Sequence, residues 1–325
     1  MRGNVEDMYK IKLENVSYVY SKGTPFEHRA LSDATVGIRQ GCITGIIGHT
    51  GSGKSTMMQL LNGLTLPSEG RVLLDGYDIN SDPKAVYEEW RTLPEYRNLS
   101  KSAAKKAIKR EILQRRRMLC FRVGLVMQYP EYQLFEETVF KDIAYGPHNM
   151  GLSEEEINAR VLEAAAFTGI GKELLDKSPF DLSGGQKRRV ALAGVIAMRP
   201  EVLVLDEPAA GLDPHGRDFI FDGIVNYQQA TQSTVLIVSH SMEDMARYCE
   251  DMIVMADSHV VASGSCREVF ANVKQLSDIG LDIPQITRLM QMLRSRGMDV
   301  PENVYTVEEA VQALRTVFGK GGEPA

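Results

Sequence analysis

The sequence lacks the features that mark several common classes of protein. Its four cysteines lie far apart and form no CxxC pair, which argues against a zinc site or a redox motif and favours reduced thiols. No window approaches the roughly 20 apolar residues that cross a bilayer. Residues 1–12 lack the apolar core of a signal peptide. We therefore expect a soluble, cytoplasmic protein that reaches a membrane only through a partner.

An excess of positive charge is also missing. The formal net charge is −6, so no nucleic-acid partner is expected. The 325 residues have room for one large core or two modest ones, and the hydrophobic fraction of 43% is that of an ordinary globular protein.

Strand-like and helix-like segments alternate along the chain. Residues 9–20 alternate apolar and polar side chains, as a strand with one buried face does. Val202–Leu205 and Val235–Val238 are continuous apolar runs, which are typical of parallel strands covered on both faces. The order of the segments predicts an α/β fold with a parallel sheet, and from about residue 271 a small helical unit.

A glycine-rich loop between an apolar strand and a helix fits the pattern GxxxxGK[ST]. In such loops the backbone N–H groups and the positive end of the helix dipole surround a phosphate. Lys54 is expected to reach the β- and γ-phosphates, and the Ser55 hydroxyl to bind Mg²⁺. A chance glycine turn is the alternative, against which the flanking strand and helix argue. The residues expected to bind nucleotide here are Gly48, His49, Thr50, Gly51, Ser52, Gly53, Lys54, Ser55 and Thr56.

A second apolar strand, Val202–Leu205, is followed by Asp206 and Glu207. Asp206 is placed to hold Mg²⁺ through water, and Glu207 to polarise an attacking water as a general base. In isolation, two acids after a strand could be a solvated strand end. Together with a phosphate loop they indicate nucleotide hydrolysis.

The motif LSGGQ precedes another helix and offers a hydroxyl, N–H groups and a helix dipole to an anion. A simple N-cap with a glycine hinge is the alternative. The motif is the signature of the ABC ATPases, and the chain resembles that family. The resemblance implies that the motif covers the γ-phosphate of the nucleotide held by another subunit. Its residues are Leu182, Ser183, Gly184, Gly185 and Gln186.

The resemblance assigns roles to four further residues. Gln128, in VGLVMQYP, is similar to the Q-loop glutamine that senses Mg²⁺ and lines the water. His240, in TVLIVSH, resembles the switch histidine that bonds the γ-phosphate and orients Glu207. Asp213 matches the D-loop aspartate at the dimer interface, and Tyr20 the aromatic residue that stacks on adenine. The implied catalytic residues are therefore Glu207, His240 and Gln128, and those around Mg²⁺ are Ser55, Gln128 and Asp206.

Longer segments, among them YPEYQLFEETVFKDIAYGPHNMGLS, resemble the ATPases of energy-coupling factor transporters over about residues 10–270. VSYVYSKGTPFE and IIGHTGSGKSTMMQ favour the second of the two paralogous A subunits. The resemblance implies a P-loop (RecA-like) ABC nucleotide-binding domain at 9–270 with an antiparallel β subdomain and a helical subdomain at about 129–182. A C-terminal helical subdomain at 271–325 is the expected dimer contact.

The same resemblance implies the partners. Two ATPase subunits, identical or different, form a dimer at the cytoplasmic face of the membrane and hydrolyse ATP with Mg²⁺. A membrane T subunit docks at the surface beside the Q-loop, and a separate S subunit captures a vitamin or metal ion. Four acids near Gln128 predict a docking surface for basic helices of the T subunit, although a solvated helix start is an equal alternative. They are Glu131, Glu136, Glu137 and Asp142.

Residues 83–118 form a longer insertion than that family usually has. Between Arg97 and Arg117 there are nine basic residues and one acid, Glu111. A solvated helical hairpin is the favoured interpretation, and contact with anionic lipid headgroups is the alternative.

Two rival functions remain to be weighed against a transport motor. Soluble ABC proteins of translation or DNA repair have tandem cassettes or long coiled coils, and neither pattern occurs in this sequence. A partner that binds ATP and only regulates usually lacks one of the catalytic groups, whereas Glu207, His240 and LSGGQ are all in place. The sequence does not name the transported substrate.

Overall fold

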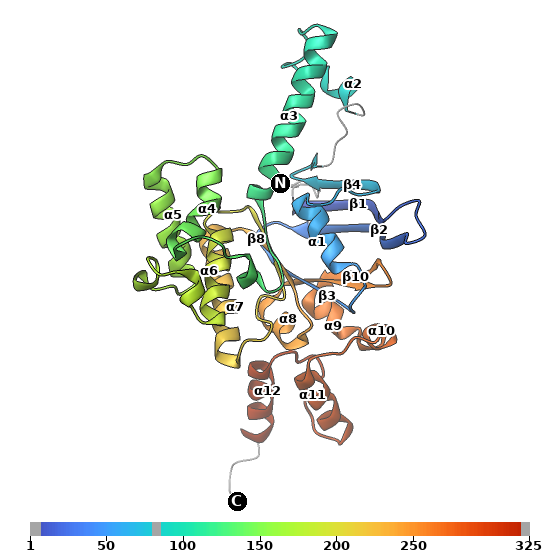
Figure 1. Ribbon diagram of the computed structural model, residues 1–325. Helices are drawn as coiled ribbons and strands as arrows, with labels where there is room; N and C mark the ends of the chain where they lie inside the picture. The colour runs from blue at the N-terminus through green and yellow to red at the C-terminus, as the bar shows by residue number, and fades with distance from the viewer. Residues whose placement is uncertain (1–7, 80–85, 320–325) are drawn as a thin grey trace, which may run out of the picture.

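The computed structural model describes residues 8–79 and 86–319 (Figure 1). Within them, the larger sheet has six strands in the spatial order β10, β9, β3, β8, β7, β6. Neighbouring strands from β9 to β6 run parallel, and β10 pairs with β9 antiparallel. The predicted α/β fold is confirmed. The strands are β3 (Ile43–Gly48), β6 (Val123–Val126), β7 (Val202–Asp206), β8 (Thr234–Val238), β9 (Asp251–Ala256) and β10 (His259–Ser265).

A second, antiparallel sheet has the strand order β2, β1, β4, β5 and lies on the side of the molecule that Figure 1 colours blue. Helix α1 (Lys54–Asn62) lies between the two sheets, since Met57 and Leu60 share one core with Ile46 of β3 and with the inner faces of β1 and β2. The strands are β1 (Tyr9–Tyr20), β2 (His28–Arg39), β4 (Glu69–Leu74) and β5 (Tyr77–Asp78).

Helices cover the other face of the larger sheet and enclose the largest core. Residues 129–182, the expected helical subdomain, contain α4, α5 and three short 3-10 helices. Helix α5 begins with the capping box in which Ser153 and Glu156 bond each other's backbone N–H groups. The elements on this face are η2 (Pro130–Gln133), α4 (Val139–Asn149), α5 (Glu154–Phe167), η3 (Lys172–Leu174), η4 (Pro179–Asp181), α6 (Gly184–Ile196), α7 (Pro214–Thr231) and α8 (Met242–Tyr248).

The parallel pairing places the predicted chemistry at one edge. Carboxyl ends of parallel strands meet at the same edge of a sheet, where α/β proteins bind ligands. Gly48 ends β3 and Asp206 ends β7, while Gln128 and His240 each come two residues after a strand.

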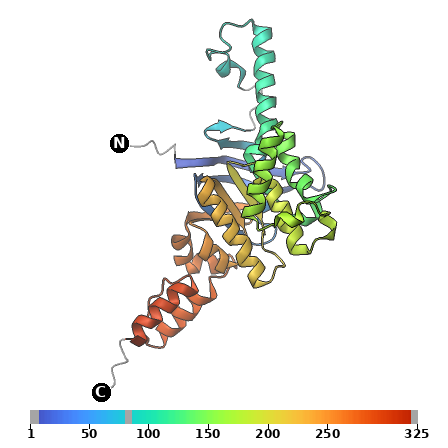
Figure 2. The ribbon, with the colours of Figure 1, turned by 90° about the vertical axis from the view of Figure 1, so that its left-hand side faces the viewer.

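The insertion forms one long helix, α3 (Lys101–Arg122), preceded by the short α2 (Tyr87–Trp90) and by turns; its first residues, 83–85, lie outside the described residues. The expected helical hairpin is therefore wrong in part, because only one of its two arms is a long helix. Figures 1 and 2 both show α3 projecting from the body. The helix continues past the expected end at 118, because Leu119 is buried in the core beneath α1.

The C-terminal helices α11 and α12 project from the end of the molecule opposite to α3 (Figures 1 and 2). They have a small core of their own, which includes Met290 and Val304. The helices are α9 (Cys266–Ala271), α10 (Val273–Asp278), α11 (Gln285–Ser295) and α12 (Val307–Gly319). Across residues 8–79 and 86–319, no helix combines the length and apolarity that a membrane span requires.

Candidate functional site

The phosphate loop connects β3 to α1, and its two ends are packed against the main chain of other segments. A Cβ atom on Gly48 would lie 2.2 Å from the carbonyl oxygen of Met255, and one on Gly53 would lie 2.4 Å from that of Ala30. Gly53 also has φ of 100°, in the left-handed region. Glycine is therefore required at both ends. The tip of the loop is exposed at His49, Thr50 and Gly51.

Lys54 is the first residue of α1, and its side chain reaches back into this loop. Its Nζ donates hydrogen bonds to the carbonyl oxygens of Gly48 (2.6 Å) and His49 (2.8 Å). Burial lowers the pKa of Lys54, and the negative charges of Glu207 and Asp206 oppose that shift. The ammonium group is thus held inside the loop, where a phosphate enclosed by the loop would meet it.

Three more predicted residues lie in the loop or beside it. Tyr20, at the end of β1, has its hydroxyl 3.2 Å from Oγ1 of the buried Thr56, so the antiparallel sheet presents this half-exposed ring beside α1. Ser55 is exposed at the start of α1. Within the described part of the chain, the buried hydroxyl of Ser52 has no hydrogen-bond partner, and such a donor is normally satisfied by a ligand or water.

The acidic pair stands at the end of β7. Glu207 has φ of 49°, a region that costs a residue other than glycine on the order of 1–3 kcal/mol. A hydrogen bond from its backbone N–H to the carbonyl oxygen of Val238 (2.9 Å) ties the strained residue to β8. Non-glycine strain of this kind concentrates at functional sites, because the surrounding structure must enforce it.

Glu207 and His240 face each other across this edge. Oε1 of Glu207 is 3.6 Å from Nε2 of His240. This oxygen is buried and has no hydrogen-bond partner among the residues that the structure describes. Burial raises the pKa of Glu207 to about 7, and the charge of Asp206 adds to the rise. Burial also raises the pKa of Asp206, while burial and the nearby Lys54 lower the pKa of His240. A carboxyl group whose pKa lies near the working pH is suited to proton transfer.

The signature motif begins α6. Ser183 Oγ accepts from the N–H of Gln186 (3.3 Å), and Gln186 Oε1 accepts from the N–H of Ser183 (2.9 Å). Ser183 thus caps α6, as the alternative interpretation of the motif predicted. Leu182, which precedes the cap, is buried. The cap does not explain the glycines: a Cβ on Gly184 would meet nothing within 4 Å, and one on Gly185 only a leucine carbon at 3.8 Å. The open surface there admits close approach by another molecule.

The positions of Asp213 and Gln128 do not by themselves indicate a ligand. Asp213 caps α7, its Oδ1 accepting from the N–H of Gly216 at 2.7 Å. Gln128 is exposed after β6. Their roles toward a partner subunit and Mg²⁺ stay predictions.

Arg188 is a functional candidate that the sequence reasoning missed. It lies on α6, its side chain is 5% exposed, and its Nε and Nη2 donate to the two carboxylate oxygens of Glu131 at 3.1 and 3.0 Å. Its Nη1 donates to the carbonyl oxygen of Ala210, and its guanidinium lies over the ring of Tyr129. One buried cation thus joins the segment after Gln128, the signature helix and the loop before Asp213. The only sequence signal was its place as the middle of three consecutive basic residues after LSGGQ.

A second link missed from sequence joins the phosphate loop to the C-terminal helices. The His49 ring nitrogen Nε2 is 2.9 Å from the carbonyl oxygen of Ile279, between α10 and α11. Nearby, Glu243 of α8 accepts from the N–H of Gln285 at 3.2 Å. Nucleotide binding by His49 stays a prediction, and its side chain contacts Ile279.

The site suits a magnesium nucleotide. Mg²⁺ usually binds through one or two protein oxygens, phosphates and waters, and Asp206 and the exposed Ser55 supply such oxygens near the phosphate loop. Lys54, and the unpartnered hydroxyl of Ser52, suit phosphate oxygens. The unpartnered Oε1 of Glu207 suits a water.

Comparison with known proteins identifies the family. A family profile described as ABC transporter matches residues 31–210. The energy-coupling factor transporter ATP-binding protein EcfA2 of Caldanaerobacter subterraneus subsp. tengcongensis is 49% identical over 304 residues, which are 94% of this chain and 96% of that protein. EcfA2 of Clostridioides difficile is 46% identical over 314 residues, 96% of this chain and 99% of that protein. The chain belongs to the energy-coupling factor transporter ATP-binding proteins.

Solved structures agree with this family. The cbiO1 protein of Clostridium perfringens, described as part of an ABC transporter complex, superposes with a TM-score of 0.65 at 37% identity, covering 87% of this chain and 99% of that one. A bacterial ABC transporter cassette solved as a dimer superposes with a TM-score of 0.61 at 27% identity, covering 79% and 98%.

The acids beside the Q-loop of this energy-coupling factor ATPase require a correction. Glu131 is bound by the buried Arg188, Glu137 pairs with Lys141, and Asp142 accepts from the backbone N–H groups of Phe135 and Glu136. Three of the four carboxylates thus have partners within the chain. Reversing the charge of Glu131 would therefore disturb the isolated subunit, contrary to the sequence-based expectation that this residue is available to a T subunit.

We predict that Glu131→Lys destabilises the isolated chain. Removing one partner of a buried ion pair typically costs about 3–5 kcal/mol, because the other charge stays buried and unpaired. Glu137→Lys is the matched control: Glu137 is 80% exposed, and surface pairs contribute less than about 1 kcal/mol. Urea unfolding of both variants measures the free energy of unfolding. Similar losses in the two variants would contradict the role given to Arg188.

We also predict that Glu207→Gln stabilises the nucleotide-free chain in a pH-dependent way. Because the folded-state pKa is raised from 4.5 to about 7, folding favours the protonated carboxyl group. Wild-type stability therefore falls as the pH rises from 4.5 to about 7 and then levels off. Glutamine does not ionise, so the melting temperature of the variant should exceed that of wild type increasingly over this window. Glu69→Gln, at an exposed position of β4, should show no such trend; a constant difference for Glu207→Gln would refute the burial effect.

Proposed function

We propose that this chain is the ATP-hydrolysing motor subunit of an energy-coupling factor importer and works at the cytoplasmic face of the membrane. The observation that carries the proposal is the meeting of Lys54, Asp206, Glu207 and His240 at one edge of the parallel sheet, with a carboxylate oxygen of Glu207 buried and unpartnered. The family to which the chain belongs consists of transporter subunits that bind ATP. A related cassette, 26% identical with a TM-score of 0.61, was solved bound to ADP and phosphate.

In the proposed reaction, Lys54 binds the β- and γ-phosphates and Tyr20 stacks on the adenine. Asp206, Ser55 and Gln128 would hold Mg²⁺, which supplies charge neutralisation at the phosphates when bound. Glu207 accepts a proton from the attacking water, since its free Oε1 faces the site. His240 stays neutral at physiological pH because its pKa is lowered, and it orients Glu207 through the 3.6 Å contact.

A second ATPase subunit, identical or different, completes the site. Each chain carries a phosphate loop and a signature motif, and the space outside Gly184 and Gly185 is open to a partner's γ-phosphate. Glycine is a poor helix former, and the contacts around Gly184 and Gly185 within the described chain do not require it at either position. A head-to-tail dimer uses both motifs, with Asp213 and the C-terminal helices as further contacts.

For the T subunit, we propose an aromatic surface beside the Q-loop in place of the acidic one. Tyr132 is 84% exposed, and Phe135 and Tyr145 are exposed with their rings in T-shaped contact at 4.9 Å. Exposed aromatic side chains are enriched among the residues that dominate interface energies. Glu136 remains beside them for a basic partner group. The substrate of the importer, a vitamin or a metal ion, is selected by the S subunit.

We predict that Glu207→Gln keeps ATP affinity and loses turnover. Loss of a general base typically lowers the rate by 10²–10⁴-fold, whereas Lys54 and the loop that bind the phosphates are unchanged. Steady-state hydrolysis and binding of a fluorescent ATP analogue are measured on the assembled transporter. Hydrolysis within threefold of wild type would exclude Glu207 as the base.

We predict that Tyr132→Ala weakens assembly with the membrane scaffold and leaves the basal ATPase activity of the isolated subunits unchanged. The ring has too little burial to support the fold, so its loss is felt only by a partner. The matched control is Phe26→Ala. This ring is 83% exposed and lies in the β1–β2 connection, about a hundred residues from Tyr132 in the sequence. Pull-down of the T subunit by each variant is compared with wild type. Equal recovery with both variants would place the docking surface elsewhere.

A further inference from the structure

One side of α3 carries four exposed cations. Lys106, Lys109, Arg110 and Arg117 are exposed and lie within one arc of the helix, with Leu113 (52% exposed) between them. We call these five residues the cation face. None of its four cations has an ion-pair partner among residues 8–79 and 86–319. The one acid of the helix, Glu111, lies outside this arc and pairs with Arg115.

The charge of the molecule is distributed very unevenly, with the positive charge concentrated around this face. Residues 97–117 hold nine basic residues and one acid, a charge of +8, and because the whole chain carries −6 the remainder carries −14. The helix also bears like charges four residues apart, as at Lys105 with Lys109 and Lys106 with Arg110. Such pairs destabilise a helix by about 0.2–0.5 kcal/mol each. These like charges therefore oppose the stability of the helix that carries them.

Packing on the inner side of α3 offsets this repulsion. Ala104, Ile108 and Ile112 are buried against Tyr87 and Tyr96. These contacts give the insertion an apolar core separate from those of the two sheets.

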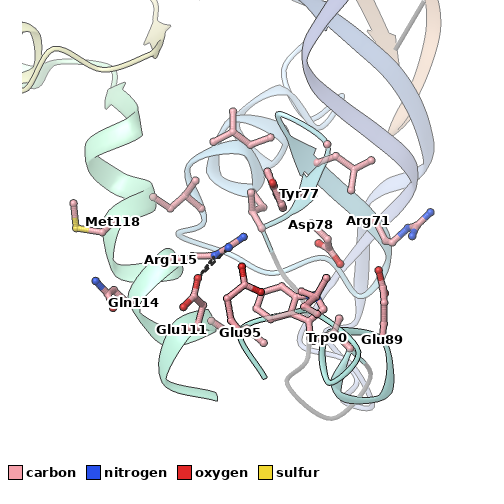
Figure 3. A pocket seen from close by; sticks show the side chains of 18 of the residues that line it. Arg71, Tyr77, Asp78, Glu89, Trp90, Glu95, Glu111, Gln114, Arg115 and Met118 are labelled. Carbon is pink, nitrogen blue, oxygen red and sulfur yellow. Dashed lines mark hydrogen bonds and ion pairs between the residues drawn. The ribbon is translucent and has the colours of Figure 1, made fainter. Parts of the chain in front are cut away.

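A stacked arginine joins the insertion to the antiparallel sheet across a hollow of about 1270 Å³ (Figure 3). The guanidinium of Arg115 lies 5.0 Å from the ring centroids of both Tyr77, on β5, and Trp90, on α2. Its Nε and Nη2 donate to Oε1 of Glu111 at 3.2 and 3.0 Å. Cation–π contacts of this kind contribute about 0.5–2 kcal/mol each.

The base of α3 is fixed as well. Arg122 donates to both carboxylate oxygens of Glu201 (2.7 and 2.8 Å) and to Asp75, and Lys10 binds the same two acids. Arg122 and Lys10 lower the pKa of Glu201 to about 2, Arg122 contributing most. Arg115 and Arg122 thus hold α3 in place, so the cation face is presented in a fixed direction.

We propose that the cation face binds the anionic headgroups of the membrane in which the transporter scaffold lies. This inference rests on the proposed function, because it takes the membrane to be the polyanionic surface beside the assembled subunit. Each Lys or Arg near an anionic bilayer gains about 1 kcal/mol. The projection of α3 from the body keeps the acidic remainder away from that surface (Figures 1 and 2). At 22 residues α3 is about 33 Å long, several times the Debye length of about 8 Å in physiological salt.

Leu113 distinguishes a membrane from a nucleic acid as the partner. An exposed leucine among cations enters the headgroup–acyl boundary favourably, as in interfacial amphipathic helices. It gains nothing against a phosphodiester backbone, which cations alone bind.

The test measures co-sedimentation of the full chain with vesicles of phosphatidylcholine alone or mixed with phosphatidylglycerol. Wild type should sediment with the mixed vesicles and lose binding as salt rises. Changing the four cations of the face to glutamine should reduce binding at least tenfold. The matched control removes four exposed cations elsewhere and should bind as wild type does; these are Lys172, Lys177, Lys274 and Arg296.

Two further arms make the result decisive. Leu113→Ser should weaken vesicle binding without changing retention on heparin, a soluble polyanion. Basal ATPase activity should be the same in every variant, since α3 carries no residue of the nucleotide site; thus activity tests the proposed function separately from the membrane contact. Equal binding to neutral and anionic vesicles, or equal loss in the control, would overturn the proposal. Binding of RNA or DNA without vesicle binding would also overturn it.

Discussion

The parallel pairing of β3, β8 and β7 is the constraint on which the rest of the molecule depends. Their side chains are buried on both faces, so the register is fixed by packing against α1 on one side and the helical layer on the other. That register brings the phosphate loop, the acid pair and His240 to one edge. A one-residue slip of β7 would turn its buried side chains to the opposite face and displace Glu207.

Several features of the site are energetically unfavourable and persist because the surrounding fold enforces them. Glu207 has a strained backbone and a carboxyl group whose burial raises its pKa to about 7, and Lys54 is buried with a lowered pKa. Each charge is disfavoured in the nucleotide-free chain, because water has been replaced by groups of lower polarity. Phosphate oxygens and a bound water would relieve these costs. The same features that destabilise the free subunit therefore favour binding and hydrolysis.

Arg188 supplies a physical route between surface and site. A buried bidentate pair with Glu131 and a bond to Ala210 tie the Q-loop segment to the signature helix and the segment before Asp213. Such a pair moves as a unit, since separating it leaves a buried charge uncompensated. A scaffold that displaces the exposed aromatic residues after Gln128 would thereby displace α6 as well. Under the proposed function, this arrangement would couple docking to hydrolysis.

The sequence by itself determined the family and its ATPase chemistry, because the phosphate loop, the acid pair and the signature are local patterns of residue type and spacing. It also determined the α/β fold through the buried apolar runs. Tertiary structure decided which charged side chains pair within the chain and which stay free to bind a partner. Glu131 looked like a surface acid until α6 placed Arg188 against it, and His49 is directed to Ile279, 230 residues away. The insertion became one long helix, because Leu119 is buried in the main core and Arg115 is held between two rings. Long-range pairing of this kind leaves no periodicity in the chain, so local sequence patterns do not reveal it.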